Sequence, residues 1–156
     1  MNHRLMSCVA ALLFSLGAVA QPSLPLQAAN AVGQRFTPQQ IKGRVAMVFY
    51  WSTTCAVCRD SLPELRANAA GWRGKPFAMV YVNVDRTAED WLAYEHIAAR
   101  VQVGGDKPLS LHQDASVAAP PRLPLTVLVD AQGKVVARFE GRMAPEAWDL
   151  VADLLP

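Results

Sequence analysis

Apolar residues are concentrated in a few long runs, and the strongest of these predict β-strands that are buried on both faces. They cover residues 45–51, 77–84 and 125–130 and are rich in β-branched and aromatic side chains. A strand with one exposed face would instead alternate polar and apolar residues. A further strand, residues 135–140, follows a turn with glycine at a position that tolerates positive φ, which is typical of a hairpin.

Helical spacing of apolar residues marks the segments between and after these strands. One helix is expected to begin near Cys55, directly after residues 52–54, a Ser-Thr-Thr turn whose hydroxyl groups are typical helix caps. Another follows a capping signature and covers about residues 87–100, and the last covers residues 145–155.

The predicted order of elements is strand, helix, strand, helix, strand, strand, helix. Strand–helix–strand units give parallel strand pairs with right-handed crossovers, and the terminal hairpin adds antiparallel strands. The section between the second helix and residue 125 is interrupted by glycine and proline and is expected to be irregular. We therefore predict a single α/β domain over residues 21–156, a three-layer sandwich with a mixed sheet flanked by helices.

The first 20 residues have the pattern of an export signal. A short basic start with Arg4 precedes an apolar run, which ends in Ala18-Val19-Ala20 with small residues where a signal peptidase cleaves. A membrane anchor left in place is the alternative, although the run is slightly short for a full span. We expect residues 1–20 to be a signal peptide and the protein to be periplasmic, anchored to the inner membrane only if this segment is retained.

Composition and charge fit this picture and exclude one class of partner. The chain has 156 residues, of which 52% are hydrophobic, and this is enough for one continuous core. The formal net charge is +2, and no run of like charges occurs. Binding to nucleic acid would require basic residues gathered on one face, so we expect no nucleic-acid partner.

The chemical signal lies in Cys55 and Cys58, which form a Cys-x-x-Cys motif where a buried strand leads into a helix. Unpaired amides and the dipole at a helix start favour a thiolate, and a cysteine one turn further on is close enough to form a disulfide. A small exported scaffold stapled by disulfides would carry four or more cysteines, whereas here the remaining one, Cys8, falls in the predicted signal. The motif therefore indicates thiol–disulfide exchange by an attacking and a resolving thiol.

Residues 49–59, followed by Pro63, resemble the active-site segment of thioredoxin-superfamily proteins, and residues 122–133 resemble the segment that carries their cis-proline loop. The long stretch between these segments, the predicted export and the Asn-Val-Asp sequence at 83–85 make the chain similar to the TlpA/ResA-like branch. The resemblance covers about residues 33–155. It implies a thioredoxin-like fold and an exported thiol–disulfide oxidoreductase, in a branch that includes the reductases of cytochrome c maturation.

The resemblance also implies site residues. Cys55 is the expected nucleophile and Cys58 the resolving thiol, so both are catalytic and together form the redox disulfide. Pro124 is expected to follow a cis peptide bond, with the Leu123 backbone pairing to an extended substrate segment, and Trp51 is expected to shield the site. Trp51, Leu123 and Pro124 are thus the expected substrate-binding residues. The alternatives are a strand-entry proline and plain core packing of the tryptophan. The expected partners are oxidised protein substrates and a membrane thiol-reductant donor, with no cofactor.

Some positions depart from the family pattern. Phe49 stands where thioredoxins have a buried acid, and Ser61 stands where TlpA/ResA-like proteins often have a glutamate that moves protons to and from the resolving thiol. Asp60 and Glu64 are nearby, but both are interpreted as solvated helix charges, and Arg59 is interpreted as an outward-facing, solvated side chain. The residues themselves leave the redox direction open, and the resemblance alone favours reduction.

Other functions on the same fold remain open. A Cu(I) carrier would combine the thiolates with His96 or His112, yet neither histidine has a recognisable ligand spacing to the cysteines. Surface histidines are the simpler interpretation, and no metal site is predicted. A thiol peroxidase is less well supported, because the Pro-x-x-x-Thr-x-x-Cys arrangement of such enzymes is not present before Cys55.

Overall fold

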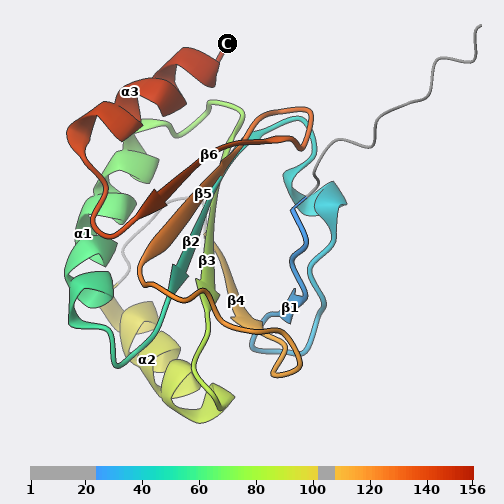
Figure 1. Ribbon diagram of the computed structural model, residues 1–156, viewed down its shortest axis with the longest axis vertical. Coiled ribbons are helices and arrows are strands. Elements are labelled where there is room, and N and C mark those ends of the chain that lie inside the picture. The colour runs from blue at the N-terminus through green and yellow to red at the C-terminus, as the bar shows by residue number, and fades with distance from the viewer. Residues whose placement is uncertain (1–23, 102–107) are drawn as a thin grey trace, which may run out of the picture.

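The computed structural model describes residues 24–101 and 108–156, and within these ranges its centre is a six-stranded sheet (Figure 1). The strand order is β1-β4-β3-β2-β5-β6. The strands are β1 Ala28–Ala29, β2 Val45–Trp51, β3 Phe77–Asn83, β4 Leu109–Gln113, β5 Leu125–Val129 and β6 Val135–Glu140. All the strands that the sequence predicts are therefore present, and each ends within one residue of its expected position.

Three α-helices in the described part of the chain pack on one face of the sheet, and the N-terminal segment covers the other (Figure 1). The helices are α1 Ala56–Gly71, α2 Ala88–Val101 and α3 Pro145–Leu154. On the second face, Leu24, Leu26 and Phe36 pack together with Ile41 of the short 3₁₀ helix η1 (Pro38–Ile41). The predicted α/β sandwich with a mixed sheet is confirmed, and the N-terminal segment forms its third layer.

The central strand, β2, divides its side chains between the two layers. All its residues are buried. The side chains that face the helices belong to Val45, Met47, Phe49 and Trp51, and those that face the N-terminal segment belong to Ala46, Val48 and Tyr50. Burial on both faces removes the polar alternation of a half-exposed strand, which is why β2 appears in the sequence as a continuous apolar run.

Strand directions bring several chain segments to one edge of the sheet. β2, β3 and β4 are parallel, and β5 is antiparallel to β2. Trp51 is level with Asn83 on the next strand, and Tyr50 is level with Leu125 on the opposite neighbour. The segments that follow β2 and β3 therefore meet the segment that precedes β5 at this edge, where open α/β sheets commonly carry their sites.

The predicted irregular section before residue 125 contains a strand, β4, and the prediction was wrong at this point. β4 has no β-branched residue, and only Leu111 and Gln113 are buried. Its outer neighbour is the two-residue β1, so the ladder with β3 supplies most of its pairing. Pairing with β3, and not local propensity, makes this segment a strand, since strand propensity depends strongly on tertiary context.

The predicted signal peptide, residues 1–20, lies outside the described residues. Among the helices of residues 24–101 and 108–156, none is long and apolar enough to cross a membrane.

Candidate active site

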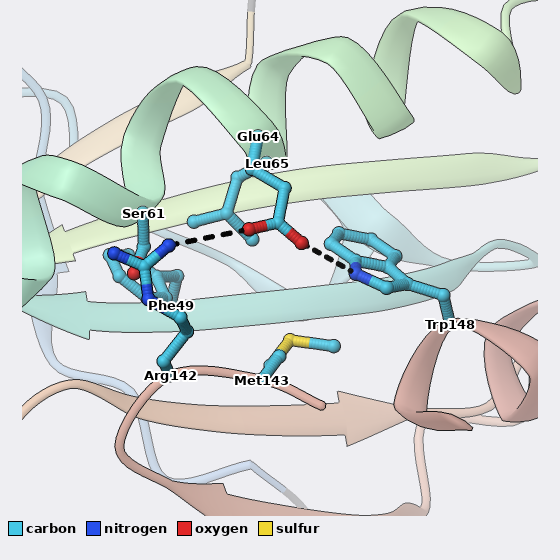
Figure 2. A pocket seen from close by; sticks show the side chains of 7 residues that line it. All are labelled: Phe49, Ser61, Glu64, Leu65, Arg142, Met143 and Trp148. Carbon is cyan, nitrogen blue, oxygen red and sulfur yellow. Dashed lines mark hydrogen bonds and ion pairs between the residues drawn. The ribbon is translucent and has the colours of Figure 1, made fainter. Parts of the chain in front are cut away.

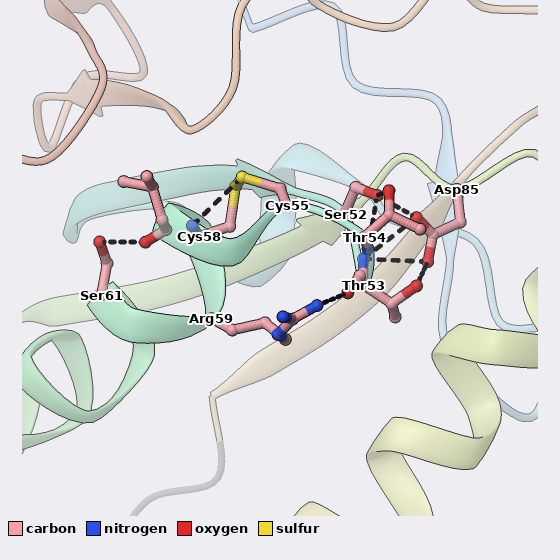
Figure 3. Close-up of a disulfide and its surroundings, with 9 residues drawn as sticks. Ser52, Thr53, Thr54, Cys55, Cys58, Arg59, Ser61 and Asp85 are labelled. Atoms are coloured by element: carbon pink, nitrogen blue, oxygen red, sulfur yellow. Dashed lines mark hydrogen bonds between the residues drawn. A yellow bond between two sulfur atoms is a disulfide. The ribbon is translucent and has the colours of Figure 1, made fainter.

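The cysteines of the Cys-x-x-Cys motif form a disulfide at the start of α1 (Figure 3). Their sulfur atoms are 2.08 Å apart and their Cα atoms 5.2 Å apart. Cys55 is the N-cap residue of α1, and its Sγ accepts a hydrogen bond from the backbone N–H of Cys58 at 3.1 Å. Cys55 is half-buried, whereas Cys58 is 0% exposed. An incoming thiol or disulfide therefore reaches Cys55 first.

The sequence predicts that hydroxyl groups of the turn before Cys55 cap α1, but the hydroxyls of Ser52 and Thr53 bind the carboxylate of Asp85 instead, and that of Thr54 contacts Ser52 Oγ (Figure 3). Ser52 Oγ donates to Oδ1 at 2.5 Å, and Thr53 Oγ1 donates to Oδ2 at 2.7 Å. The Thr53 N–H lies 3.1 and 3.2 Å from the two oxygens, and Asn83 Nδ2 donates to Oδ2 at 3.0 Å. The N-cap residue of α1 is Cys55 itself.

These hydrogen bonds determine the charge state of Asp85. Partial burial by itself raises the pKa of the carboxyl, but the hydrogen bonds from Ser52, Asn83 and Thr53 together outweigh it. The pKa of Asp85 is consequently held below its ordinary value. The folded chain thus stabilises the carboxylate form.

Replacing this carboxylate, in Asp85→Asn, should lower the stability of the fold at neutral pH but not in acid. A carboxyl whose pKa is lowered by folding contributes stability above its unfolded pKa of roughly 4, and this contribution is lost as the pH falls through the folded pKa. We expect a loss of about 1.5–3 kcal/mol at neutral pH, the range for hydrogen bonds to a charged group. Urea unfolding of wild type and variant across acidic pH measures the difference, and a difference that does not shrink in acid would contradict the assignment.

Arg59 binds the same turn from the opposite side. Its Nη1 donates to the carbonyl oxygen of Thr53, whose N–H is bound by Asp85 (Figure 3). Arg59 is exposed, as expected, but it is not simply a solvated charge. The carboxylate of Asp85 and the guanidinium group of Arg59 therefore hold the two peptide groups that flank Thr53. Thr53 lies two residues before Cys55, the N-cap residue of α1.

The segment with Leu123 and Pro124 lies beside this turn at the edge of the sheet. The Leu123–Pro124 peptide bond is cis, as the family resemblance implies. Pro124 is buried, and its carbonyl oxygen accepts a hydrogen bond from the Gly141 N–H at 2.8 Å. Leu123 is half-buried and packs against the side-chain clusters of both sheet faces. Because Leu125 is level with Tyr50, Leu123 and Pro124 lie alongside the end of β2.

Trp51 lies below the site and not on its surface. Its side chain is 1% exposed and packs edge-on against the ring of Tyr94, with the ring centroids 4.7 Å apart. A side chain buried to this extent is covered by its neighbours, and the expected contact of Trp51 with substrate stays a prediction. Core packing, the alternative interpretation, describes its position.

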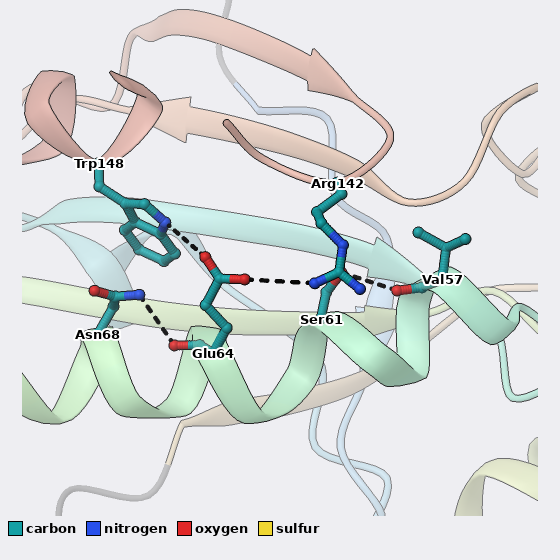
Figure 4. A network of polar contacts seen from close by, with 6 residues as sticks. All are labelled: Val57, Ser61, Glu64, Asn68, Arg142 and Trp148. Atoms are coloured by element: carbon teal, nitrogen blue, oxygen red, sulfur yellow. Dashed lines mark hydrogen bonds and ion pairs between the residues drawn. The ribbon is translucent and has the colours of Figure 1, made fainter. Parts of the chain in front are cut away.

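The face of α1 beyond the cysteines contacts α3 and the segment leading into it (Figures 2 and 4). Glu64 accepts a hydrogen bond from Trp148 Nε1 at 3.3 Å and pairs with Arg142 Nη1 at 3.6 Å. Glu64 is therefore not the free helix charge that the sequence predicts, although its pair with Arg142 is exposed enough to contribute little stability. Asp60, its neighbour one turn earlier, is exposed.

Ser61, which stands where the family resemblance leads one to expect a glutamate, is buried and donates to the Val57 carbonyl oxygen at 2.8 Å (Figure 4). It lines a small hollow with Phe49, Glu64 and Arg142 (Figure 2). The volume open to the centre of a water molecule is about 10 Å³, close to the minimum for one water. The hydroxyl is thus used within the helix, in the manner typical of a serine in a helix interior.

In the described part of the chain, His96 and His112 make their polar contacts with groups other than Cys55 and Cys58. On α2, His96 Nε2 is 2.8 Å from Arg100 Nη2. His112 is half-buried on β4, where its ring stacks on Trp91 and its Nε2 lies 3.0 Å from the Asp85 carbonyl oxygen. This placement corrects the interpretation of His112 as a surface residue of an irregular section. Within residues 24–101 and 108–156, no group of three or more histidine, cysteine or acidic side chains is arranged to hold a metal ion.

Comparison with known proteins agrees with the fold and the motif. The family model described as Redoxin matches residues 16–154. A candidate thiol:disulfide interchange protein DsbE from Chlorobium tepidum is similar in structure, with 21% identity and a TM-score of 0.67 over 86% of this chain and 93% of the other. A candidate thiol-disulfide oxidoreductase from Bacteroides vulgatus has 19% identity and a TM-score of 0.67, covering 85% and 94% of the two chains.

A thiol:disulfide interchange protein from Bacteroides sp. is similar to the same degree. It has 20% identity and a TM-score of 0.66, with 85% of this chain and 88% of the other covered. The search among curated proteins found no match. At these identities, the solved structures support the fold alone. The family model covers nearly the whole chain and therefore shows the family.

Proposed function

Because this chain belongs to the Redoxin family and is a thiol–disulfide oxidoreductase of thioredoxin fold, we propose that it is exported to the periplasm and there reduces disulfides of protein substrates. The observation that carries the proposal is the asymmetric cysteine pair at the start of α1, with Cys55 accessible and Cys58 buried directly behind it. Family resemblance supplies the direction of the reaction.

The reaction begins with the reduced pair. The Cys55 thiolate attacks one sulfur of a substrate disulfide, the substrate S–S bond breaks, and the other substrate sulfur leaves as a thiolate that takes up a proton. The product is a mixed disulfide between Cys55 and the substrate. The Cys58 thiolate then attacks Cys55 Sγ, which releases the second substrate sulfur and forms the Cys55–Cys58 disulfide. The substrate gains two electrons, and the protein loses them.

The position of Cys55 favours the first step. A sulfur at the N-cap lies at the positive end of the helix dipole, and the Cys58 N–H points to it at 3.1 Å. Both features stabilise a thiolate more than a thiol, and the thiolate is the nucleophile in disulfide exchange. The burial of Cys58 restricts it to the intramolecular second step.

Apolar side chains around the cysteines fit a protein substrate. Val57, between the cysteines, is 46% exposed, and Leu123 is half-buried beside the cis-proline bond. We assign these residues to a contact with an extended substrate segment, in which the Leu123 backbone supplies hydrogen bonds. A catalytic cycle also requires a dithiol that reduces the Cys55–Cys58 disulfide again, and we assign this step to a membrane thiol donor.

Two measurements on the purified protein test the proposal. It should accelerate the reduction of insulin by dithiothreitol, and its Cys55–Cys58 couple, equilibrated with glutathione, should have a potential below roughly −220 mV, as reducing members of the superfamily do. A reaction with dithiothreitol alone is the control. A potential near −120 mV, which is typical of a strong oxidant, would reverse the proposed direction, and failure to accelerate insulin reduction would count against protein disulfides as substrates.

A further inference from the structure

We infer that Asp85 is a positioning residue for Cys55: it holds the Ser52–Thr54 turn so that the nucleophilic sulfur stays at the N-terminus of α1. This inference deepens the proposed function, since it rests on the role of Cys55 as the nucleophile. Asp85 itself lies two residues beyond the end of β3. Its two oxygens accept hydrogen bonds from Ser52, Thr53 and Asn83, so both are fully engaged (Figure 3).

The restraint passes from the carboxylate to Cys55 through Ser52. The Ser52 hydroxyl, which donates to Asp85, accepts a hydrogen bond from the Thr54 N–H at 3.1 Å and contacts Thr54 Oγ1 at 2.8 Å. The Ser52 carbonyl oxygen accepts from the Cys55 N–H at 3.1 Å. Ser52, Thr53 and Thr54 are therefore bound to a single carboxylate directly or through one hydroxyl group, and Cys55 is bound to this turn through the Ser52 carbonyl oxygen.

The sheet in turn fixes Asp85. Its N–H donates to Asn83 Oδ1 at 3.0 Å, and Asn83 is buried. Its carbonyl oxygen lies 3.0 Å from Nε2 of His112, whose ring stacks on buried Trp91. Asn83 on β3 thus holds both the N–H and the carboxylate of Asp85, and His112 on β4, stacked on Trp91 of α2, contacts its carbonyl oxygen. Because these contacts do not involve the turn, the carboxylate is preorganised and does not simply follow the turn.

The consequence for the thiol follows from geometry and has a definite sign. If the turn loosens, Cys55 Sγ spends less time against the Cys58 N–H and the positive end of α1, so the thiolate is less stabilised and the pKa of the thiol rises. The negative charge of Asp85 acts in the opposite direction, because removing a nearby anion lowers the pKa of a thiol. The direction of the change therefore distinguishes positioning from a simple charge effect.

The test is a titration of Cys55 as the single thiol, in the full chain with Cys8→Ser and Cys58→Ser, by thiolate absorbance near 240 nm. Adding Asp85→Asn should lower the thiolate fraction at neutral pH by about threefold or more, consistent with the spread of cysteine pKa values at helix starts. Ser52→Ala, which breaks one connection and keeps the charge, should change it in the same direction. If Asp85→Asn does not fold, Ser52→Ala decides the question.

Asp114→Asn is the matched control. Asp114 follows β4 at the same edge of the sheet, and its carboxylate also accepts hydrogen bonds from a neighbouring N–H and hydroxyl, both of Ser116. We expect no change in the Cys55 titration for this variant. An unchanged or larger thiolate fraction in both Asp85→Asn and Ser52→Ala would overturn the inference. The titration uses no substrate, so its result does not depend on whether the wild type reduces insulin. A failure of the positioning role of Asp85 can therefore be distinguished from a failure of the proposed reductase function.

Discussion

Cys58→Ser should turn the protein into a trap that remains covalently joined to its substrate through Cys55. In this variant the mixed disulfide forms, but the buried thiol that would break it is absent. Turnover in the insulin assay should fall on the order of a hundredfold or more, as expected when one member of a catalytic unit is removed. Non-reducing electrophoresis after incubation with an oxidised protein should show an adduct that dithiothreitol releases.

The matched variant, Cys55→Ser, should form no adduct and should be equally inactive. Its remaining thiol, Cys58, is 0% exposed and cannot meet a disulfide on another protein without a change in the fold. If Cys55→Ser formed the adduct and Cys58→Ser did not, the roles of the two cysteines would have to be exchanged. The asymmetry in their burial would then have no part in the mechanism.

Leu62→Ala should destabilise the protein by about 2–5 kcal/mol, the range for truncating a buried leucine. Leu62 is 2% exposed. Together with Cys58 and Leu65, it lies on the face of α1 that packs in the hydrophobic cluster between the helices and the sheet. The free energy of unfolding of a domain of this size is typically only about 5–15 kcal/mol, so the variant loses a large part of its stability. Urea unfolding, with the disulfide kept oxidised in both proteins, measures the change.

Leu92→Ala is the control for this prediction. Leu92 is also a helical leucine, on α2, but it is 42% exposed, so its truncation should cost less than about 1 kcal/mol. Similar losses for the two variants would mean that the contacts of α1 with the sheet contribute less than their burial indicates. In that case the anchoring of the cysteines would depend mainly on the turn before them.

The central strands and the cysteine motif could be predicted because each leaves a local pattern. β2 and β3 are buried on both faces, so their sequences are apolar throughout, and the motif lies directly at the end of one of them. β4 has no such pattern, since it is short, partly exposed and held mainly by its ladder with β3. Its place in the sheet depends on a partner that local sequence does not reveal.

Contacts within the site were harder to predict, because they join side chains from different elements. Asp85 stands out in the sequence only through the family resemblance, and its binding to Ser52 and Thr53 follows from the parallel register that sets Trp51 level with Asn83. The Glu64–Arg142 pair likewise depends on where the segment before α3 crosses α1. The charged residues could be identified in advance, but their partners could not.

The second face of the sheet is covered by residues 24–41 and not by an α-helix, and this has a consequence for the order in which the domain is completed. Ala28 pairs with Gln113, on a strand that is synthesised much later. The layer formed by residues 24–41 therefore cannot be complete until β4 is present, and contacts so distant along the chain are slow to form. The packing of Phe36 and Ile41 against β2 needs no such wait, because these residues are close to β2 in the chain.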